Sequence, residues 1–374
     1  MKRLMLLLMF APFFVCAARQ ADFEKEFATS AGKKVDIDLK TGGGIAIRGW
    51  ARDSVLVRGF REGRDGDDAT LEMELTSSGV SVRSYYAGSR RNRNGGIRLE
   101  ISVPRRYDVR VESMGGGVSI DDVEGTMTGK TMGGELTLTG LKGNLDLLTM
   151  GGAVTLRHSD VDGSVKTMGG AVDVEDVTGN VKPSSMGGNV TQKNITRRKG
   201  EKSGGEVNIS TMGGAINVDD APEGAVLSTM GGPIHVRSAA RFVKAKTMGG
   251  EVRLDAVDGW IDATTMGGDM KATMTGDPSA GKRSVALSSM AGDITLSVPA
   301  GLSMDITIEL SYTEGHEGEY TITSDFPIRQ EVSREWERDN GSPRKTIHGT
   351  GTVSGGNNRI TLKTINGNVT LKKL

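Results

Sequence analysis

The most regular feature of the chain is a series of short segments in which apolar and polar residues alternate. Val172 and Val174 alternate with acidic residues, and Val252 and Leu254 take the same places in a later segment. A second alternating run, such as 243–247, precedes each of these segments. A period of two residues predicts β-strands with one buried face.

A tetrapeptide, Ser/Thr-Met-Gly/Ala-Gly, joins each such pair of segments and occurs ten times. The intervals between its methionines are 18 residues, apart from one of 26 and one of 24. A fixed period predicts units that bury their apolar faces only by stacking on their neighbours. The ten methionines are Met114, Met132, Met150, Met168, Met186, Met212, Met230, Met248, Met266 and Met290.

These patterns predict an all-β fold, a single-chain β-solenoid (parallel β-helix) with 18-residue coils of unassigned handedness. Counted from each Met, positions +4, +6, +9 and +13 should face the core, and glycines at +1, +2 and +11 should form corners with positive φ. We expect regular coils over 113–300, irregular N-terminal coils over 19–112, and C-terminal coils over 301–374 with a polar loop or hairpin at 312–349.

The two long intervals predict insertions at one shared corner of the stack, at 196–202 and 276–283. Solenoids tolerate insertions that are confined to one edge. Both insertions are basic, which makes this edge a candidate contact for an anionic partner, although a solvated loop is the simpler interpretation of the charges. The basic residues are Arg197, Arg198, Lys199, Lys202, Lys282 and Arg283.

Stacked coils would place the ten methionines in one row, for which three interpretations stand. Methionine fills irregular gaps, which favours packing. Strand parity points the preceding Ser/Thr inward and would turn Met toward solvent as an apolar binding stripe, although the glycine corner could rotate the chain. Thioethers also suit Cu(I) or Ag(I).

The polar ladders have simpler interpretations. The Ser/Thr before each Met should form hydroxyl hydrogen bonds between coils. The residues at +7 and +8 alternate in sign between neighbouring coils, as in Arg157-His158 and Glu175-Asp176, which favours control of register. The alternative is a carboxylate set for polysaccharide cleavage or Ca²⁺, but alternation disperses the acids.

The remaining candidate chemistry is sparse. The four histidines have no metal-ligand spacing, and Trp50, Trp260 and Trp336 lie far apart in the sequence. The chain has 47 basic and 47 acidic residues, whereas a nucleic-acid binder usually has a basic excess. We expect no catalytic residue, no cofactor, no metal bound by His or Cys, and no nucleic-acid partner.

The N-terminus is typical of a secretory signal peptide, which we assign to residues 1–18. Lys2 and Arg3 precede an apolar run from Leu4 to Val15, followed by small residues suited to cleavage. The run is too short to span a bilayer as a helix, and we expect no membrane span. Cleavage after Ala17 or Ala18 would remove Cys16, the only cysteine, so the exported chain would have no disulfide.

The repeated corner-and-strand units and the C-terminal run from Gly355 to Val369 resemble the bacterial DUF4097 family of β-strand-repeat, adhesin-like proteins. The resemblance spans about 35 to 374 and implies a β-helix at the cell envelope or surface, with no catalytic residues to transfer. It departs from the family by placing Met where a small polar residue is usual.

We therefore expect a non-enzymatic, exported protein in the periplasm or at the cell surface. It would be an adhesin or scaffold rod whose partner is an envelope or surface protein or glycan, with self-association left open. The alternatives are a β-helix enzyme acting on polysaccharide and a periplasmic Met-rich buffer for Cu(I) or oxidants.

Overall fold

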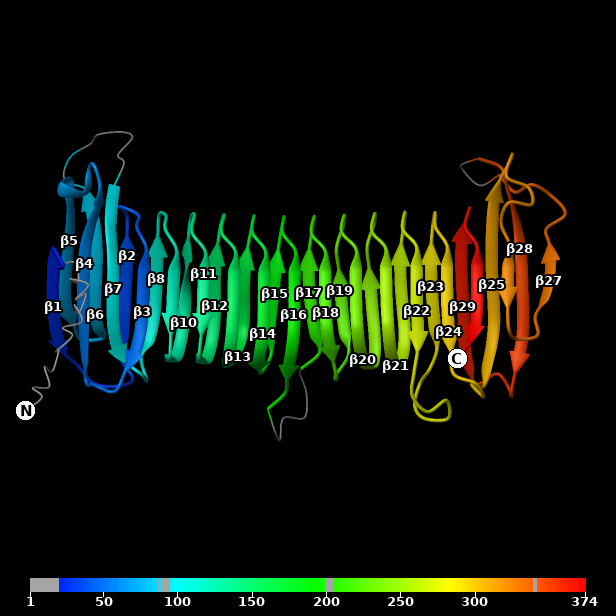
Figure 1. The fold of residues 1–374 in the computed structure, drawn as a ribbon, viewed down its shortest axis with the longest axis horizontal. Helices are drawn as coiled ribbons and strands as arrows, with labels where there is room; N and C mark the ends of the chain where they lie inside the picture. Colours follow the sequence, from blue (N-terminus) through cyan, green and yellow to red (C-terminus); the bar gives the residue numbers. More distant parts are fainter. Residues whose placement is uncertain (1–19, 87, 89–94, 199–204, 339–341) are drawn as a thin grey trace, which may run out of the picture.

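The protein is all-β and strongly elongated (Figure 1). The computed structural model describes residues 20–86, 88, 95–198, 205–338 and 342–374, so the expected signal peptide at 1–18 lies outside the described residues. Within them there are 30 strands in one continuous mixed sheet, no α-helix, and a single 3₁₀ turn, η1 (Gly66–Asp68). The all-β prediction is confirmed.

The strands fall into an N-terminal, a central and a C-terminal group. The first group is β1 (Phe23–Ala28), β2 (Lys34–Leu39), β3 (Ile45–Trp50), β4 (Ser54–Gly63), β5 (Ala69–Thr76), β6 (Gly79–Tyr86), β7 (Gly95–Pro104), β8 (Asp108–Ser113) and β9 (Val118–Asp121). The central group is β10 (Glu124–Thr131), β11 (Leu136–Thr139), β12 (Lys142–Thr149), β13 (Val154–Thr167), β14 (Val172–Thr178), β15 (Val181–Ser185), β16 (Val190–Thr196), β17 (Val207–Thr211), β18 (Ile216–Ala221), β19 (Ala225–Ser228), β20 (Ile234–Lys246), β21 (Val252–Thr265), β22 (Met270–Met274), β23 (Val285–Ser289) and β24 (Ile294–Val298). The last group is β25 (Met304–Thr313), β26 (Ile322–Ser324), β27 (Arg329–Val332), β28 (Arg344–Val353), β29 (Asn358–Ile365) and β30 (Val369–Lys373).

In the central group every strand pairs in parallel with the equivalent strand of the next repeat. Met127 of β10 lies opposite Leu145 of β12, and Val172 of β14 lies opposite Val190 of β16, in each case 18 residues along the chain. Strands that end just before a Ser/Thr-Met-Gly/Ala-Gly motif form one series, and strands that begin just after it form another. The long strands β13, β20 and β21 run from one series into the other. The predicted repeat register is confirmed.

The predicted core positions are buried. In the unit of Met168, the apolar residues at +4, +6, +9 and +13 are Val172, Val174, Val177 and Val181, and each is at most 3% exposed. Apart from Phe60, the buried apolar side chains of the described residues belong to one contiguous cluster along the rod. Stacking thus supplies the core that no single 18-residue unit can form alone.

The predicted role of the corner glycines is wrong in one respect. Of the second glycines in the ten motifs, only those at the two ends of the row, Gly116 and Gly292, have φ between 20° and 160°. The others are required by close approach, because a Cβ on Gly152 would overlap the carbonyl group of Gly134 in the preceding unit. The +11 prediction holds at Gly125, Gly143 and Gly179, whose φ values are 154°, 116° and 115°, but it is wrong at Gly259, which has no positive φ in this range and is instead limited by close approach to the carbonyl of Arg241.

A left-handed corner that the sequence analysis missed lies at +8. Five consecutive units place five residues there with φ between 49° and 67°, and the residue type varies. Asparagine, aspartate, histidine and glycine are the residues that adopt this conformation at least cost. The five are Asp122, Gly140, His158, Asp176 and Asn194.

Both insertions leave from the same edge, as predicted. Val207 of β17 pairs with Ala225, and Val285 of β23 pairs with Ile261, so the register resumes after each insertion. Figure 1 shows the β16–β17 and β22–β23 connections together on the lower edge of the rod. We call this the insertion edge.

The two ends of the rod are built differently from its body. At each end, one strand lies between two neighbouring strands that are not the next repeats in the sequence. At the C-terminal end, β29 lies between β23 and β25. At the N-terminal end, β2 lies between β8 and β6. Antiparallel strand pairs lie beyond these strands at both ends. At the N-terminal end β4 pairs with β1 and β7, and at the C-terminal end β28 pairs with β25 and β27.

Candidate functional site

The methionine row lies on the surface, along the edge opposite the insertions. Nine of its ten side chains are between 38% and 63% exposed, and Met150 is partly exposed. The packing interpretation is therefore wrong, and strand parity indicated the correct side. We call the ten methionines together the Met edge.

The Met edge is positioned by the buried hydroxyl that precedes each Met. The hydroxyl of Thr167 donates to the carbonyl of Gly152 in the preceding unit at 2.7 Å and accepts from the backbone N–H of Gly170 at 3.1 Å. Equivalent bonds from hydroxyl to glycine carbonyl recur from Thr131 to Ser289. The predicted ladder between coils is thus present, but its acceptors are backbone carbonyls and not neighbouring hydroxyls.

The row is continuous across both insertions. The backbone N–H of Met212 donates to the carbonyl of Met186 at 3.2 Å, although 26 residues separate the two in sequence. The N–H of Met290 likewise reaches Thr265 in the unit of Met266, at 3.3 Å. Neighbouring methionines therefore lie one strand spacing apart, about 4.8 Å, over the whole row.

The corner does not need methionine in order to form. In the C-terminal unit, Thr364 makes the same bond to the carbonyl of Gly292 at 2.6 Å. Gly367 makes the same close backbone approach, and Ile365 stands where the other units have Met. At the other end Lys40 lies beside Met114, because Leu39 pairs with Ser113. The ten methionines are thus not explained by the folding of the corner.

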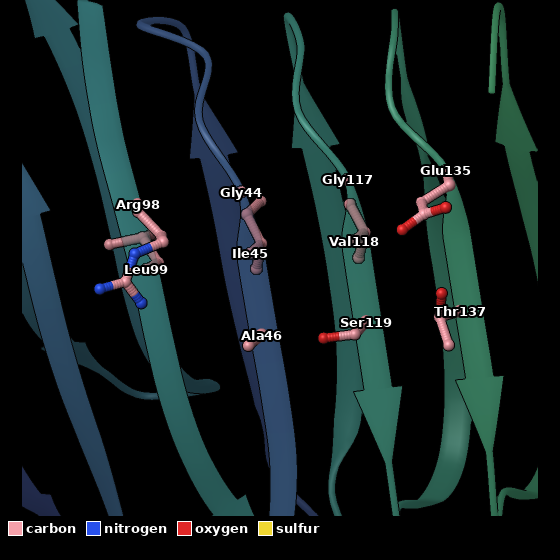
Figure 2. Close-up of a pocket in the computed structure, with 10 residues that line it drawn as sticks. All are labelled: Gly44, Ile45, Ala46, Arg98, Leu99, Gly117, Val118, Ser119, Glu135 and Thr137. Carbon is pink, nitrogen blue, oxygen red and sulfur yellow. The ribbon is translucent and has the colours of Figure 1, made fainter. Parts of the chain in front are cut away.

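A shallow pocket of about 480 Å³ opens at the N-terminal end of the Met edge. Met114 and Met132 supply its apolar side, and charged residues of both signs supply the rest: Asp38, Lys40, Glu112 and Lys130. A second depression, of about 230 Å³, lies on the sheet face nearby. Figure 2 shows its small residues between Arg98 and Glu135. Arg98 already pairs with Glu62 at 3.0 Å and with Glu100.

The basic residues of the insertion edge are tied to the rod where the structure describes them. Arg198 reaches Asp160 and Asp162, both at 2.5 Å, and Arg197 lies 3.5 Å from Glu223. Lys199 and Lys202 lie outside the described residues.

The second insertion is held by a buried arginine. Arg283 is only 2% exposed, and it donates to Asp258 at 2.5 Å and to the carbonyls of Thr275 and Ala280 at 2.6 and 2.9 Å. Lys282 lies 5.2 Å above the ring of Trp260, and this ring also stacks on Phe242 at 4.9 Å. Trp260 and Lys282 line a shallow depression of about 220 Å³ beside the second insertion.

The predicted alternation at +7 and +8 gives arginine–carboxylate ion pairs and a histidine–carboxylate contact between neighbouring units. Arg157 lies 3.4 Å from Glu175, and His158 lies 3.3 Å from Asp176. Arg237 likewise pairs with Asp219. These contacts are consistent with control of register.

Four carboxylates of the rod have a lowered pKa: Asp277, through hydrogen bonds from Ser279, and three that contact a basic side chain. Burial would raise the pKa of Asp162, but hydrogen bonds from Arg198 and the Asn180 backbone outweigh it. Burial would also raise the pKa of Asp255, but hydrogen bonds from His235 and Arg253 outweigh it and lower this pKa. The hydrogen bond from Arg237 lowers the pKa of Asp219. All three stay ionised near neutral pH, which makes them unsuited to act as general acids.

Two other kinds of feature are absent from the described residues. No group of three or more His, Cys, Asp or Glu side chains is placed to hold a metal ion. No helix in the part of the chain that the structure describes has the length and apolar character needed to cross a membrane.

Comparisons with known proteins give distant structural matches and nothing else. No protein-family model matches the chain, and no curated protein does. A candidate cell adhesion protein from Clostridium sporogenes is 8% identical, with 94% of this chain and 99% of that one covered and a TM-score of 0.17. Candidate adhesins from Bacteroides fragilis and Parabacteroides distasonis are 10% and 9% identical, each with 94% of this chain and 96% of theirs covered and TM-scores of 0.20 and 0.22. TM-scores this low carry no argument about the present chain.

Proposed function

We propose that this protein is a non-enzymatic rod of the cell envelope, built as a β-solenoid, that is exported and binds a partner along the Met edge. The observation that carries the proposal is the exposure of one residue type at ten equivalent places where the fold does not require it. A contiguous apolar stripe on a surface usually marks an interaction site.

The ends of the rod differ from its body, because antiparallel strands lie beyond the parallel repeats at both ends. In the described residues β1 pairs only with β4 and β27 only with β28, so the outer edges of both strands remain available for further pairing. Self-association through the ends is therefore left open beside binding along the Met edge.

The charged groups favour binding over catalysis. Hydrolysis of a glycosidic bond needs a carboxylic acid with a raised pKa beside a second carboxylate. The resolved shifts at Asp162, Asp219 and Asp255 are all downward, and each of these side chains has a cationic neighbour. Adhesion is the particular function that the family resemblance suggests for such a rod.

Location on the cell tests the proposal first. A specific protease site placed at Gly281, whose missing side chain would meet nothing within 4 Å, gives a cut that can be followed with an antibody. We expect cleavage on intact cells while a periplasmic control protein survives. Protection until the envelope is opened would exclude adhesion.

The binding surface is tested by substitution on cells that display the rod. Replacing Met168, Met186 and Met212 by Ser should reduce adhesion, whereas replacement by Leu should preserve it because Leu keeps the apolar stripe. The matched control replaces Thr155, Asp173 and Thr191, which lie on a sheet face, by Ser, Asn and Ser. Equal adhesion by all three variants would place the contact elsewhere.

A further inference from the structure

We propose that the Met edge binds soft monovalent metal ions, Cu(I) or Ag(I), at sites made by methionines of neighbouring units. The inference goes beyond the adhesion proposal and does not depend on it. It rests on the chemistry of the thioether, the spacing of the row, and the absence of any folding requirement for Met.

The ligand type selects the metal class. A thioether is neutral and polarizable, and it binds soft ions such as Cu(I) in preference to Mg²⁺, Ca²⁺ or Mn²⁺, which prefer oxygen ligands. A leucine or isoleucine at these places would give the same apolar stripe, as Ile365 does in the C-terminal unit. The repeated choice of sulfur at ten exposed places therefore favours a ligand that recognises sulfur.

The spacing suits ions shared between neighbouring units. Parallel pairing sets successive methionines about 4.8 Å apart. Two metal–sulfur bonds of about 2.3 Å span about 4.6 Å, so one ion can bridge two adjacent side chains. In a three-thioether site the middle methionine holds the ion between its two neighbours, whereas without it the two outer side chains must close a backbone separation of about 9.6 Å.

The surroundings leave the sulfurs accessible. Each Met is followed by Gly or Ala and then Gly, so no bulky side chain within the motif covers it. The buried Ser/Thr beneath holds the backbone, and the side chain above is free to reorient without disturbing the core. With two or three thioethers per ion, ten methionines provide about three to five sites.

Two variants with the same composition test the geometry. The alternating variant replaces Met132, Met168, Met212, Met248 and Met290 by Leu, which leaves five methionines with none adjacent. The block variant replaces Met212, Met230, Met248, Met266 and Met290 by Leu, which leaves five adjacent methionines. Each protein, without its signal peptide, is titrated anaerobically with Cu(I) against a coloured competing chelator, and Ag(I) serves as a redox-stable second probe.

We expect the native protein to take up about three to five equivalents. The block variant should keep about half of that uptake, and the alternating variant should lose at least nine-tenths of it. Equal uptake by the two variants would mean that single methionines bind independently, and it would overturn the proposal. Native uptake too weak to compete with the chelator would overturn it as well.

A further control separates the Met edge from thioethers in general. The methionines outside the row include four that are buried, Met127, Met270, Met274 and Met304. Their joint replacement by Leu should leave metal uptake unchanged, and thermal unfolding checks that every variant is folded. Because Leu preserves an apolar stripe, the Leu variants of the Met edge should lose metal uptake while keeping adhesion, so the two proposals fail separately.

Discussion

The two long edges of the rod meet the same stacking requirement in different ways. On the Met edge the chain turns by bringing Gly152 against the carbonyl of Gly134, which leaves no room for a side chain. On the insertion edge it turns through a left-handed residue at +8, where Asp176 and Asn194 serve as well as Gly140. Steric exclusion fixes one residue type, whereas a backbone conformation admits several.

This difference sorts the repeated residues of the motif into two kinds. The second glycine and the Ser/Thr recur because the backbone approach and the buried hydroxyl bond require them. The Met recurs although Ile365 occupies its place in a corner with the same bond and the same approach. The fold thus explains why the Ser/Thr and the second glycine recur in the motif, but it does not explain why the Met between them recurs.

The largest expected effect comes from the second glycine. Gly268→Ala places a methyl group against the backbone of Gly250, and we expect a loss of about 3 kcal/mol or more in the free energy of unfolding. Gly267→Ala is the matched control, because its nearest contact would be 3.7 Å and Ala291 occupies the same place in the next motif. Denaturant unfolding of both proteins gives the comparison. Equal midpoints would contradict the steric explanation.

The hydroxyl ladder should have the next largest effect. Thr167→Val keeps the shape but leaves the carbonyl of Gly152 without its buried donor, which should cost about 1–2 kcal/mol. Thr167→Ser should be close to neutral, because Ser185 makes the equivalent bond at 2.8 Å. Thr155→Val, on the sheet face, controls for the loss of a hydroxyl as such. If Thr167→Val leaves the free energy of unfolding unchanged, the hydroxyl ladder is not a source of stability.

A smaller effect should appear at low pH on the insertion edge. The folded pKa of Asp162 lies below its ordinary value of 3.8, so its pairing with Arg198 stabilises the protein fully above that pH and is lost as the pH falls through the folded pKa. Asp162→Asn should therefore be less stable than the native protein at pH 6, with the gap closing below pH 3.8.

Because these side chains are more than one-quarter exposed, the gap should be modest. Thermal melting across this pH range measures it, with Asp173→Asn as the control for an outward-facing carboxylate. A gap that does not narrow as the pH falls below 3.8 would show that the effect is not electrostatic.

The smallest effect on stability is expected at the repeated methionines, although they are the most prominent feature of the sequence. Met168→Ser should change the free energy of unfolding by no more than about 0.5 kcal/mol, because the side chain is exposed and the corner closes without it. The measurement is the same denaturant titration as for the glycine variants. A loss as large as that of Thr167→Val would make the row structural and weaken both proposals.

The sequence by itself determined the all-β class, the 18-residue register, the buried positions and the shared edge of the insertions. These follow from alternation and period, which are local properties: Val172 and Val174 share a face because successive strand residues point to opposite sides. The resumed register at Val207 and Val285 could be counted along the chain.

Only the tertiary structure decided where the methionines point, what the arginines contact and how the ends are built. A glycine corner can turn its neighbour either way, so Met168 was placed by the packing of Gly170 on the unit below. Arg283 is buried by a contact with Asp258, 25 residues away. The pairing of Val285 with Ile360 places β29 between β23 and β25. No local sequence pattern encodes this contact, because it forms only when the chain folds back on itself over a long sequence separation.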